Sequence, residues 1–223
     1  MKKLVISLGG SVLVPDEVNT AFLEKFKKFI LKMSRNNKIV VVTGGGHTAR
    51  VYIQALSKNG TKTQSFMGIA FTRLHAKFLY NFFKLPFYKI PKTLKEVHNL
   101  LKRNNLVFCG ALRYEPNQTS DGTAAEIARY MKADMFINIT NVKGLYNKDP
   151  CLKNAKLIKR IRFDDFYKKA KKIKFKAGQH FVLDFSAAKI IKEERIKTYI
   201  VSSNLKNIEN LLKGKSFIGT LVY

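Results

Sequence analysis

The sequence predicts an α/β protein whose sheet is buried between helices. Apolar runs of strand length alternate along the chain with longer segments whose apolar residues recur at helical spacing. The run Lys38–Thr43 is apolar without alternation, which is typical of a strand covered on both faces in a parallel sheet. The 223 residues, 46% of them apolar, are enough for one domain with a continuous core.

The first elements follow a strand, helix, strand, helix rhythm. Strand Leu4–Leu8 precedes helix Thr20–Met33, whose apolar residues fall on one face and would cover the sheet. Strand Lys38–Thr43 precedes helix Thr48–Leu56 in the same way. Both strands run directly into glycines, so the sequence predicts two sharp turns at strand ends.

The rest of the chain continues this rhythm. Helix Phe66–Phe83 carries aromatic residues on several sides, which favours packing between the sheet and a partner subunit. Thr93 and Glu96 form a capping box at the start of the next helix. The further elements expected up to residue 140 are strand Leu85–Ile90, a helix ending near Arg103, strand Leu106–Cys109, helix Thr123–Met131 and strand Met135–Thr140. Those expected after it are helix Phe163–Lys172, a turn at Lys176–Gly178, helix Phe185–Glu194, strand Lys197–Ser202, helix Asn204–Leu212 and strand Phe217–Val222.

The stretch Val40–Arg50, VVVTGGGHTAR, has the composition of a phosphate-binding turn. Three glycines at a strand end let backbone amides converge on an anion, and the following helix adds its positive N-terminal end. Arg50, one helical turn later, can direct its guanidinium to the same oxygens. The alternative is an ordinary glycine-rich turn with a surface arginine.

A second turn of this kind follows the first strand, where Leu4–Leu8 meets Gly9, Gly10 and Ser11. Two such turns indicate two phosphorylated ligands. The dinucleotide fingerprint GxGxxG and the Walker motif GxxxxGK[ST] are both absent from the sequence. Neither a dinucleotide-binding fold nor a Walker-type NTPase is therefore indicated.

The formal net charge of +27 is spread along the chain. Residues 151–223 contain 18 Lys and Arg against 6 Asp and Glu, and the remainder contains 24 against 9. A basic surface concentrates polyanions, which makes RNA binding an alternative function. The lysines are scattered over periodic segments without an RNP-type aromatic strand, a zinc knuckle or an arginine-rich arm. A generally lysine-rich composition explains this scatter as well, so nucleic acid is not the expected partner.

The composition indicates a soluble cytoplasmic protein that does not enter a membrane. The apolar runs are of strand length, and the N-terminus lacks a secretory signal. Cys109 lies in an apolar run and Cys151 follows a proline, so the two cysteines form no metal-binding pattern and no expected disulfide.

Seven motifs, in order, resemble the amino-acid-kinase superfamily. They span nearly the whole chain, which makes the resemblance more specific than one glycine turn. Within the superfamily the chain looks most like the archaeal-type uridylate (UMP) kinases. The motifs are LGGS at Leu8–Ser11, GGGHTAR at Gly44–Arg50, GIAFTR at Gly68–Arg73, TSD at Thr119–Asp121, TNVKGLYNKDP at Thr140–Pro150, KAG at Lys176–Gly178 and DFSAAKII at Asp184–Ile191.

This resemblance implies a three-layer αβα sandwich around a mainly parallel sheet, in one domain covering residues 1–223. It implies an enzyme of pyrimidine nucleotide biosynthesis that transfers the γ-phosphoryl group of ATP to UMP and gives UDP. Mg²⁺ would arrive with ATP, and no residue is assigned as a metal ligand. We expect a homohexamer. The N-terminal part would hold mainly UMP, and the part from about residue 135 mainly ATP.

The resemblance also transfers site residues, one by one. Amides and hydroxyls can coordinate phosphates, an aromatic ring can stack on a base, and a carboxylate can accept from ribose hydroxyls. The catalytic residues expected are Gly10 and Arg50, which the resemblance implies, and Lys143, which departs from the family's pattern and is added because of its charge. The residues expected at ATP are Gly9, Gly10, Gly46, Arg50, Thr140, Tyr146 and Asp149. The residues expected at UMP are Gly45, Ser65, Gln118, Thr119, Ser120 and Asp121.

Three positions depart from the family's pattern. Ser7 stands where many members have a lysine that reaches the phosphates, and Ser65 stands where a carboxylate reads the ribose. Lys143 replaces the aspartate of the family's TNVDG. We expect the Lys143 ammonium to approach the phosphates and to compensate partly for Ser7. The alternative is a solvated lysine in a lysine-rich protein.

Simpler roles are open to several of these residues. Thr119 and Ser120 can cap the helix that follows them. Asp149 can form a turn before a proline, and Tyr146 can be a core aromatic.

Two further residues, His47 and Asp184, are candidates for the site but are not predicted to be catalytic. His47 lies in the glycine-rich turn, where related isopentenyl phosphate kinases use a histidine. Because the arginine typical of UMP kinases is present as Arg50, we interpret His47 as a loop donor. Asp184 is expected to cap a helix and not to contact Mg²⁺ or phosphate.

Two other functions remain open at this point. One is a different small phosphate or carboxylate kinase of the same superfamily. The other is a non-catalytic protein that uses the kinase fold and its basic surface to bind RNA or a partner.

Overall fold

The computed structural model of the protein describes residues 1–86, 89–172 and 182–223. Strands and helices alternate along these residues, as predicted. The strands are β1 (Lys2–Leu8), β2 (Asn37–Thr43), β3 (Leu106–Cys109), β4 (Met135–Thr140), β5 (Arg160–Ile161), β6 (Thr198–Ser202) and β7 (Thr220–Val222). The helices are α1 (Gly10–Leu13), α2 (Thr20–Ser34), α3 (Gly46–Ala55), α4 (Gly60–Phe82), α5 (Leu94–Arg103), α6 (Ser120–Met131), α7 (Phe163–Lys171), α8 (Phe185–Glu193) and α9 (Leu205–Leu212).

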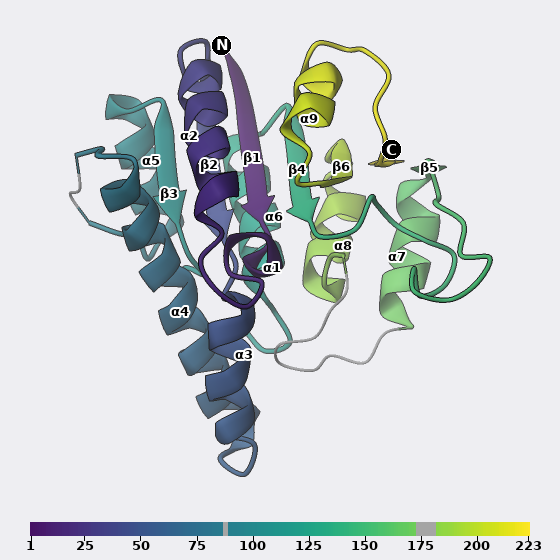
Figure 1. The fold of residues 1–223 in the computed structure, drawn as a ribbon, viewed down its shortest axis with the longest axis horizontal. Coiled ribbons are helices and arrows are strands. Elements are labelled where there is room, and N and C mark those ends of the chain that lie inside the picture. The colour runs from purple at the N-terminus through teal and green to yellow at the C-terminus, as the bar shows by residue number, and fades with distance from the viewer. Residues whose placement is uncertain (87–88, 173–181) are drawn as a thin grey trace.

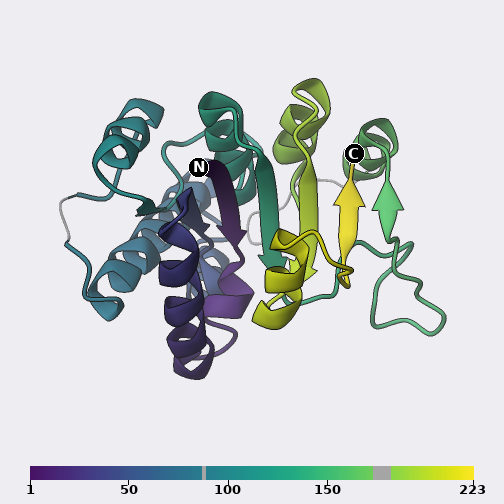
Figure 2. The ribbon, with the colours of Figure 1, turned by 90° about the horizontal axis from the view of Figure 1, so that it is seen from above.

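A seven-stranded sheet in the order β3-β2-β1-β4-β6-β7-β5 forms the centre of the molecule (Figure 1). Among the strand pairs of the described residues, β6 and β7 alone run antiparallel. Helices α5 to α8 cover one face, and α2, α9 and the C-terminal part of α4 cover the other (Figure 2). The predicted three-layer αβα sandwich with a mainly parallel sheet is confirmed.

The central strands are apolar on both sides because each side meets a separate core. In β2, Ile39 and Val41 pack in the core formed with α2, α4 and α9. Val40 and Val42 point to the opposite face and pack in the core formed with α5 to α8. All four side chains are fully buried. This is the arrangement that the continuous apolar run predicted.

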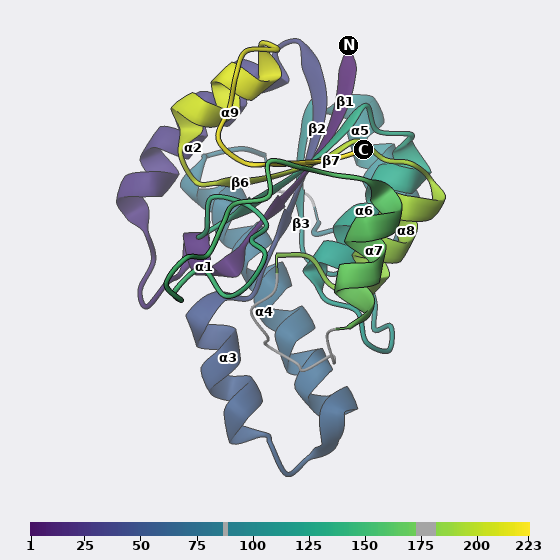
Figure 3. The ribbon, with the colours of Figure 1, turned by 90° about the vertical axis from the view of Figure 1, so that its right-hand side faces the viewer.

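Helices α3 and α4 form a hairpin that extends beyond the sheet (Figure 3). The structure begins α4 at Gly60, whereas the sequence pattern predicted a start at Phe66. The additional turns are polar, with residues 60–63 all exposed, so they carried no apolar periodicity from which a helix could be predicted.

The strand predicted over Leu85–Ile90 is wrong for its described residues, which form no strand; Phe87 and Tyr88 lie outside the described part of the chain. Lys84 has a left-handed backbone with φ of 55°, and Pro86 has no N–H with which to pair. The short helix α1 and the two-residue strand β5 were not predicted. The turn predicted at Lys176–Gly178 falls outside the described residues. Within those residues, no helix has both the length and the apolar character that a membrane crossing requires.

Candidate active site

The two glycine turns lie side by side at one edge of the sheet. Strands β1 and β2 are parallel neighbours in a register that pairs Leu8 with Thr43, so their carboxyl ends coincide. The Gly44 amide donates to the Leu8 carbonyl at 2.9 Å, and the Gly9 amide donates to the Ile139 carbonyl of β4 at 2.9 Å. The turns after β1 and β2 and the end of β4 therefore meet at one point.

Glycine is required here for contact between the turns. A Cβ atom on Gly10 would lie 2.6 Å from the Cα of Gly46, closer than such atoms approach in proteins. Gly46 itself has φ of +68°, a conformation that side-chain-bearing residues rarely adopt. Residues of both turns therefore line a common space.

That space is a cavity of about 910 Å³. It is lined by both glycine turns, the hairpin of α3 and α4, the loop before α6, the loop after β4 and the end of α7. Its size lies near the upper end of the range for small-molecule sites, and its place at strand carboxyl ends is where α/β folds bind ligands.

The structure brings nearly all of the predicted site residues to this cavity. The residues assigned to ATP that line it are Gly9, Gly10, Gly46, Arg50, Thr140, Tyr146 and Asp149. The residues assigned to UMP that line it are Gly45, Ser65, Gln118, Thr119, Ser120 and Asp121. Which of the two nucleotides each residue contacts remains a prediction.

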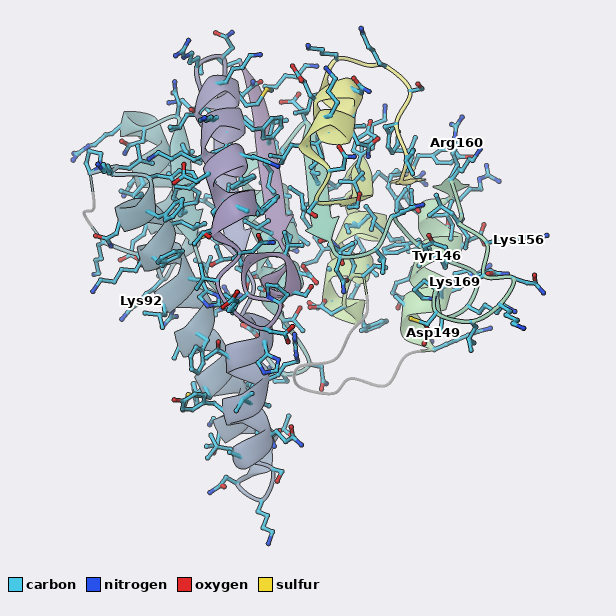
Figure 4. All side chains as sticks on the ribbon, in the orientation of Figure 1. Lys92, Tyr146, Asp149, Lys156, Arg160 and Lys169 are labelled. Carbon is cyan, nitrogen blue, oxygen red and sulfur yellow. The ribbon has the colours of Figure 1, made fainter. Side chains whose placement is uncertain are left out.

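Lys143 differs from the other predicted residues. Its side chain is exposed, and it is not among the residues that line the cavity. Of the lysines that the structure describes, Lys148, Lys169 and Lys172 line it. Lys169 of α7 lines the cavity together with Tyr146 and Asp149 of the loop after β4; Figure 4 labels all three. No sequence motif marked Lys169, because its α7 segment reads as a solvated basic helix.

Arg50 is half-buried on α3 and lines the cavity one turn after the second glycine turn. No carboxylate of the described residues lies within ion-pair distance of its guanidinium. An arginine without an acidic partner beside a cluster of amides is suited to bind an anion.

Asp184 joins the start of α8 to the start of α6. Its Oδ1 accepts from the Ala187 amide at 2.6 Å, which confirms the predicted cap of α8. Its Oδ2 accepts from the Thr119 amide at 2.7 Å, the Thr119 hydroxyl at 2.6 Å and the Gly122 amide at 3.2 Å. The Thr119 hydroxyl also accepts from the Asp121 amide at 3.2 Å, so Thr119 caps α6.

Ser7 and Asp121 form a direct contact beneath the two glycine turns. The buried Ser7 hydroxyl donates to Asp121 Oδ1 at 2.5 Å. Burial of the carboxyl and the neighbouring Asp184 carboxylate raise the pKa of Asp121 to about 7, and the Ser7 hydrogen bond opposes this rise. The cavity is therefore lined by a residue whose carboxyl pKa is raised well above its ordinary value.

Tyr114, an aromatic residue that the motifs did not single out, lines the cavity and contacts α4 next to Ser65. Phe66 of α4 packs against Tyr114 with ring centroids 5.4 Å apart, and the Lys62 ammonium lies 5.9 Å from the Tyr114 ring. Ser65 donates its hydroxyl to the Thr61 carbonyl at 2.8 Å, within its own helix. The surface beside Ser65 thus combines apolar rings with a cation.

The loop after β4 is held by contacts within itself. Tyr146 forms a bridge with Leu157, and the Asp149 Oδ1 accepts from the Cys151 amide at 2.9 Å. Asp149 is therefore a turn former, as the simpler interpretation predicted, and it also lines the cavity.

His47 lies outside the lining of the cavity. Its Nδ1 is 3.6 Å from Asp16 Oδ1, and both side chains are largely exposed. Within the described part of the chain, no three His, Cys, Asp or Glu side chains are grouped as a metal site would require.

Comparison with known proteins identifies relatives along the full length of the chain. The model of the amino acid kinase family matches residues 2–202. The uridylate kinase of Archaeoglobus fulgidus is 36% identical over 224 residues, with 99% of each chain covered. That of Thermococcus sibiricus is 35% identical over 226 residues, again with 99% of each chain covered.

Solved structures give the same result for the fold. The crystal structure of uridylate kinase from Archaeoglobus fulgidus superimposes with a TM-score of 0.84 at 35% identity and covers 100% of both chains. The structure of UMP kinase from Ureaplasma parvum superimposes with a TM-score of 0.79 over 99% of this chain and 98% of that one. The second match, at 19% identity, supports the fold alone.

Proposed function

Because the chain belongs to the amino acid kinase family, we propose that it is a UMP kinase, which transfers the γ-phosphoryl group of ATP to UMP and releases UDP and ADP. The observation that carries this proposal is the single cavity into which two touching glycine turns face. Transfer between two nucleotides requires both phosphate groups in one space, and two converging sets of amides meet that requirement.

We assign the two nucleotides to opposite sides of these turns. UMP would lie between α4 and the loop before α6, near Ser65, Gln118 and Thr119. ATP would lie against the loop after β4 and the end of α7, with its base near Tyr146. The N-terminal part of the domain would then serve mainly the acceptor and the part from about residue 135 mainly the donor.

The chemistry in this proposal rests on alignment and positive charge, without a covalent intermediate. Amides of the turns hold the phosphates in line, and the Arg50 guanidinium neutralises charge on the transferred group. Mg²⁺ would enter as part of the MgATP substrate, since the described residues show no grouped set of metal ligands.

We also propose a homohexamer that works in the cytoplasm. Exposed apolar side chains on the α3–α4 hairpin, namely Val51, Tyr52, Phe66 and Leu74, support burial of this surface against another copy of the chain. Light scattering coupled to size exclusion would measure the mass; a monomeric mass would contradict the hexamer.

A panel of acceptors tests the assigned reaction. ADP release would be followed with UMP, CMP, dTMP, isopentenyl phosphate and carbamate, each with MgATP. The proposal expects the highest kcat/KM with UMP. A clear preference for another acceptor would assign a different kinase of the family. Absence of turnover with every acceptor, together with salt-dependent RNA binding, would support the non-catalytic alternative that the charge of +27 raises.

A further inference from the structure

A carboxyl group without a cationic partner lies where the proposed phosphates would meet. Asp121 is at the start of α6, and its Oδ1 accepts from the Ser7 hydroxyl at 2.5 Å. Within the described residues its other oxygen, Oδ2, has no hydrogen-bond partner, and Asp121 lines the cavity beside Gly10 and Gly44. The free oxygen is therefore the one available to a ligand.

The surroundings of Asp121 favour the neutral acid. The carboxyl lies at the start of α6, which packs against β1 and α8, and the charged group that acts on it is the carboxylate of Asp184. Burial and this carboxylate raise the pKa of Asp121 to about 7. Among the described residues, none of the other charged groups that line the cavity forms an ion pair with Asp121. These groups are Arg50 of α3, Arg113 and Glu115 of the loop before α6, Lys148 and Asp149 of the loop after β4, and Lys169 and Lys172 at the end of α7.

We propose that Asp121 acts as a neutral acid, whose Oδ2–H donates a hydrogen bond to an oxygen of the phosphoryl group held between the two glycine turns. Asp121 is then a catalytic residue, because it touches the transferred group. The inference rests on the proposed kinase function, since it requires phosphate in this cavity.

The hydrogen bond from Ser7 explains why Oδ2 of Asp121 would carry the proton and act as a hydrogen-bond donor. The Ser7 hydroxyl donates to Oδ1, so the acid proton is left on Oδ2, the oxygen that has no partner among the described residues. An ionised carboxylate at this place would repel phosphate oxygens, whereas an O–H group stabilises them. The binding of an anionic phosphate would in turn raise the pKa of Asp121 further, because two negative charges in one site are unfavourable.

Calorimetry of the intact protein tests this without turnover. At pH 8 the free carboxyl would be mostly ionised and would take up a proton when a phosphate arrives. ATP alone and UMP alone would be titrated in buffers of different ionisation enthalpy, and the proton uptake calculated from the difference. We expect an uptake approaching one proton per site with at least one ligand. Nucleotide binding without proton uptake in the wild-type protein would overturn the inference.

Two substitutions separate the neutral acid from a carboxylate. Asn keeps an acceptor and an N–H donor in the same shape and stays neutral at every pH, whereas Ala removes the donor. We expect Asp121→Asn to retain kcat within about threefold at pH 7 and to lose the proton uptake, and Asp121→Ala to reduce kcat by about tenfold or more, as loss of one donor to a charged group does. Asn as harmful as Ala, with both variants folded by circular dichroism, would show that the charge is needed.

The pH profile supplies the control. Between pH 7 and 9 the UMP phosphate is already fully ionised, since its second pKa is about 6. The wild-type rate should fall across this range while Asp121→Asn stays flat. Asp165→Asn removes an exposed carboxylate outside the cavity and should follow the wild-type curve. A wild-type profile that Asp121→Asn leaves unaltered contradicts the inference, even if the acceptor panel has confirmed the kinase. Failure of the panel, with proton uptake still present, would contradict only the kinase.

Discussion

Gly10 and Gly46 are in direct backbone contact, although 36 positions separate them in the sequence, because each opens the helix that follows one of two neighbouring strands. The register that pairs Leu8 with Thr43 fixes this contact, since it brings both strands to an end at the same level. The cavity depends on that relationship, because a side chain at either position would push the turns apart.

Gly10→Ala tests this contact. The added methyl would meet the Gly46 backbone at 2.6 Å, so the turns must separate. We expect kcat/KM to fall by about a hundredfold, because misplacement of about 1 Å can cost that much in a reaction that relies on alignment. Gly214→Ala is the control, since its φ of +70° imposes strain without any nearby atom. A variant at Gly10 as active as the control would show that the close approach is dispensable.

Arg50→Ala should lower kcat/KM by at least about tenfold, because a hydrogen bond to a charged group is worth roughly 1.5–3 kcal/mol. Steady-state kinetics with both substrates measures the effect. Arg50→Lys keeps the charge but loses the forked geometry, so an intermediate rate is expected. Unchanged kcat/KM in the alanine variant would remove Arg50 from the site.

The sequence was sufficient for the fold because its signals are local. Continuous apolar strands, amphipathic helices and glycines at strand ends predict alternating strands and helices with a buried parallel sheet. The three-layer αβα sandwich was expected from the resemblance to the family. The predictions were wrong or missing for segments whose sequence pattern is weak. Strand β5 has two residues and gains its place only from pairing with β7. The start of α4 is polar, so no apolar stripe marked it.

Site residues that lie within a sequence motif could be predicted. Those that reach the cavity only through the folding of distant segments could not. Arg50 and the glycine turns are local in the sequence and could be assigned to one cavity. Lys169 lines the cavity because of where α7 lies in the folded chain, and no periodicity in α7 predicts that position. The raised pKa of Asp121 likewise depends on burial and on Asp184, which is 63 positions away in the sequence.

Lys143→Met and Lys169→Met form a matched pair. Lys143 is exposed and outside the cavity lining, so its loss should leave kcat within about twofold, as surface substitutions usually do. Lys169 lines the proposed ATP side, so its loss should raise KM for ATP by about threefold or more. A tenfold fall of kcat in Lys143→Met would instead support the expected role of its ammonium at the phosphates.

Asp121 should also make the free energy of unfolding depend on pH. Its folded-state pKa of about 7 lies above the ordinary value of 3.8, so the folded protein holds the proton more tightly than the unfolded chain does. The free energy of unfolding should therefore decrease as pH rises from about 4 to 7, by a few kcal/mol at about 1.4 kcal/mol per pKa unit. Urea unfolding of the wild type and Asp121→Asn at pH 5 and pH 8 measures this contribution as a difference. An equal pH dependence in both proteins would place the pKa of Asp121 near its ordinary value.

Ser7→Lys would replace the neutral hydroxyl that contacts Asp121 with a positive charge. A lysine on β1 would place an ammonium beside Asp121, lower its pKa and convert the pair from a neutral acid with a hydroxyl into an ion pair. The fall in rate above pH 7 should then disappear, because the ammonium, which keeps its charge in this range, replaces the acid proton. Ser7→Met has similar length without charge and separates this effect from crowding at a buried position.

The same variant should change the consequence of losing the Asp121 charge. In the wild type, Asp121→Asn is expected to be mild because the carboxyl is neutral once phosphate is bound. In the Ser7→Lys protein, Asp121→Asn leaves a buried ammonium unpaired, which should lower stability and reduce kcat by about tenfold. A double-mutant cycle of kcat and of unfolding free energy, measured at pH 7, should therefore show a large coupling energy between residues 7 and 121. Additive effects at the two positions would mean that the introduced lysine does not reach Asp121, and that Ser7 does not set the state of this carboxyl.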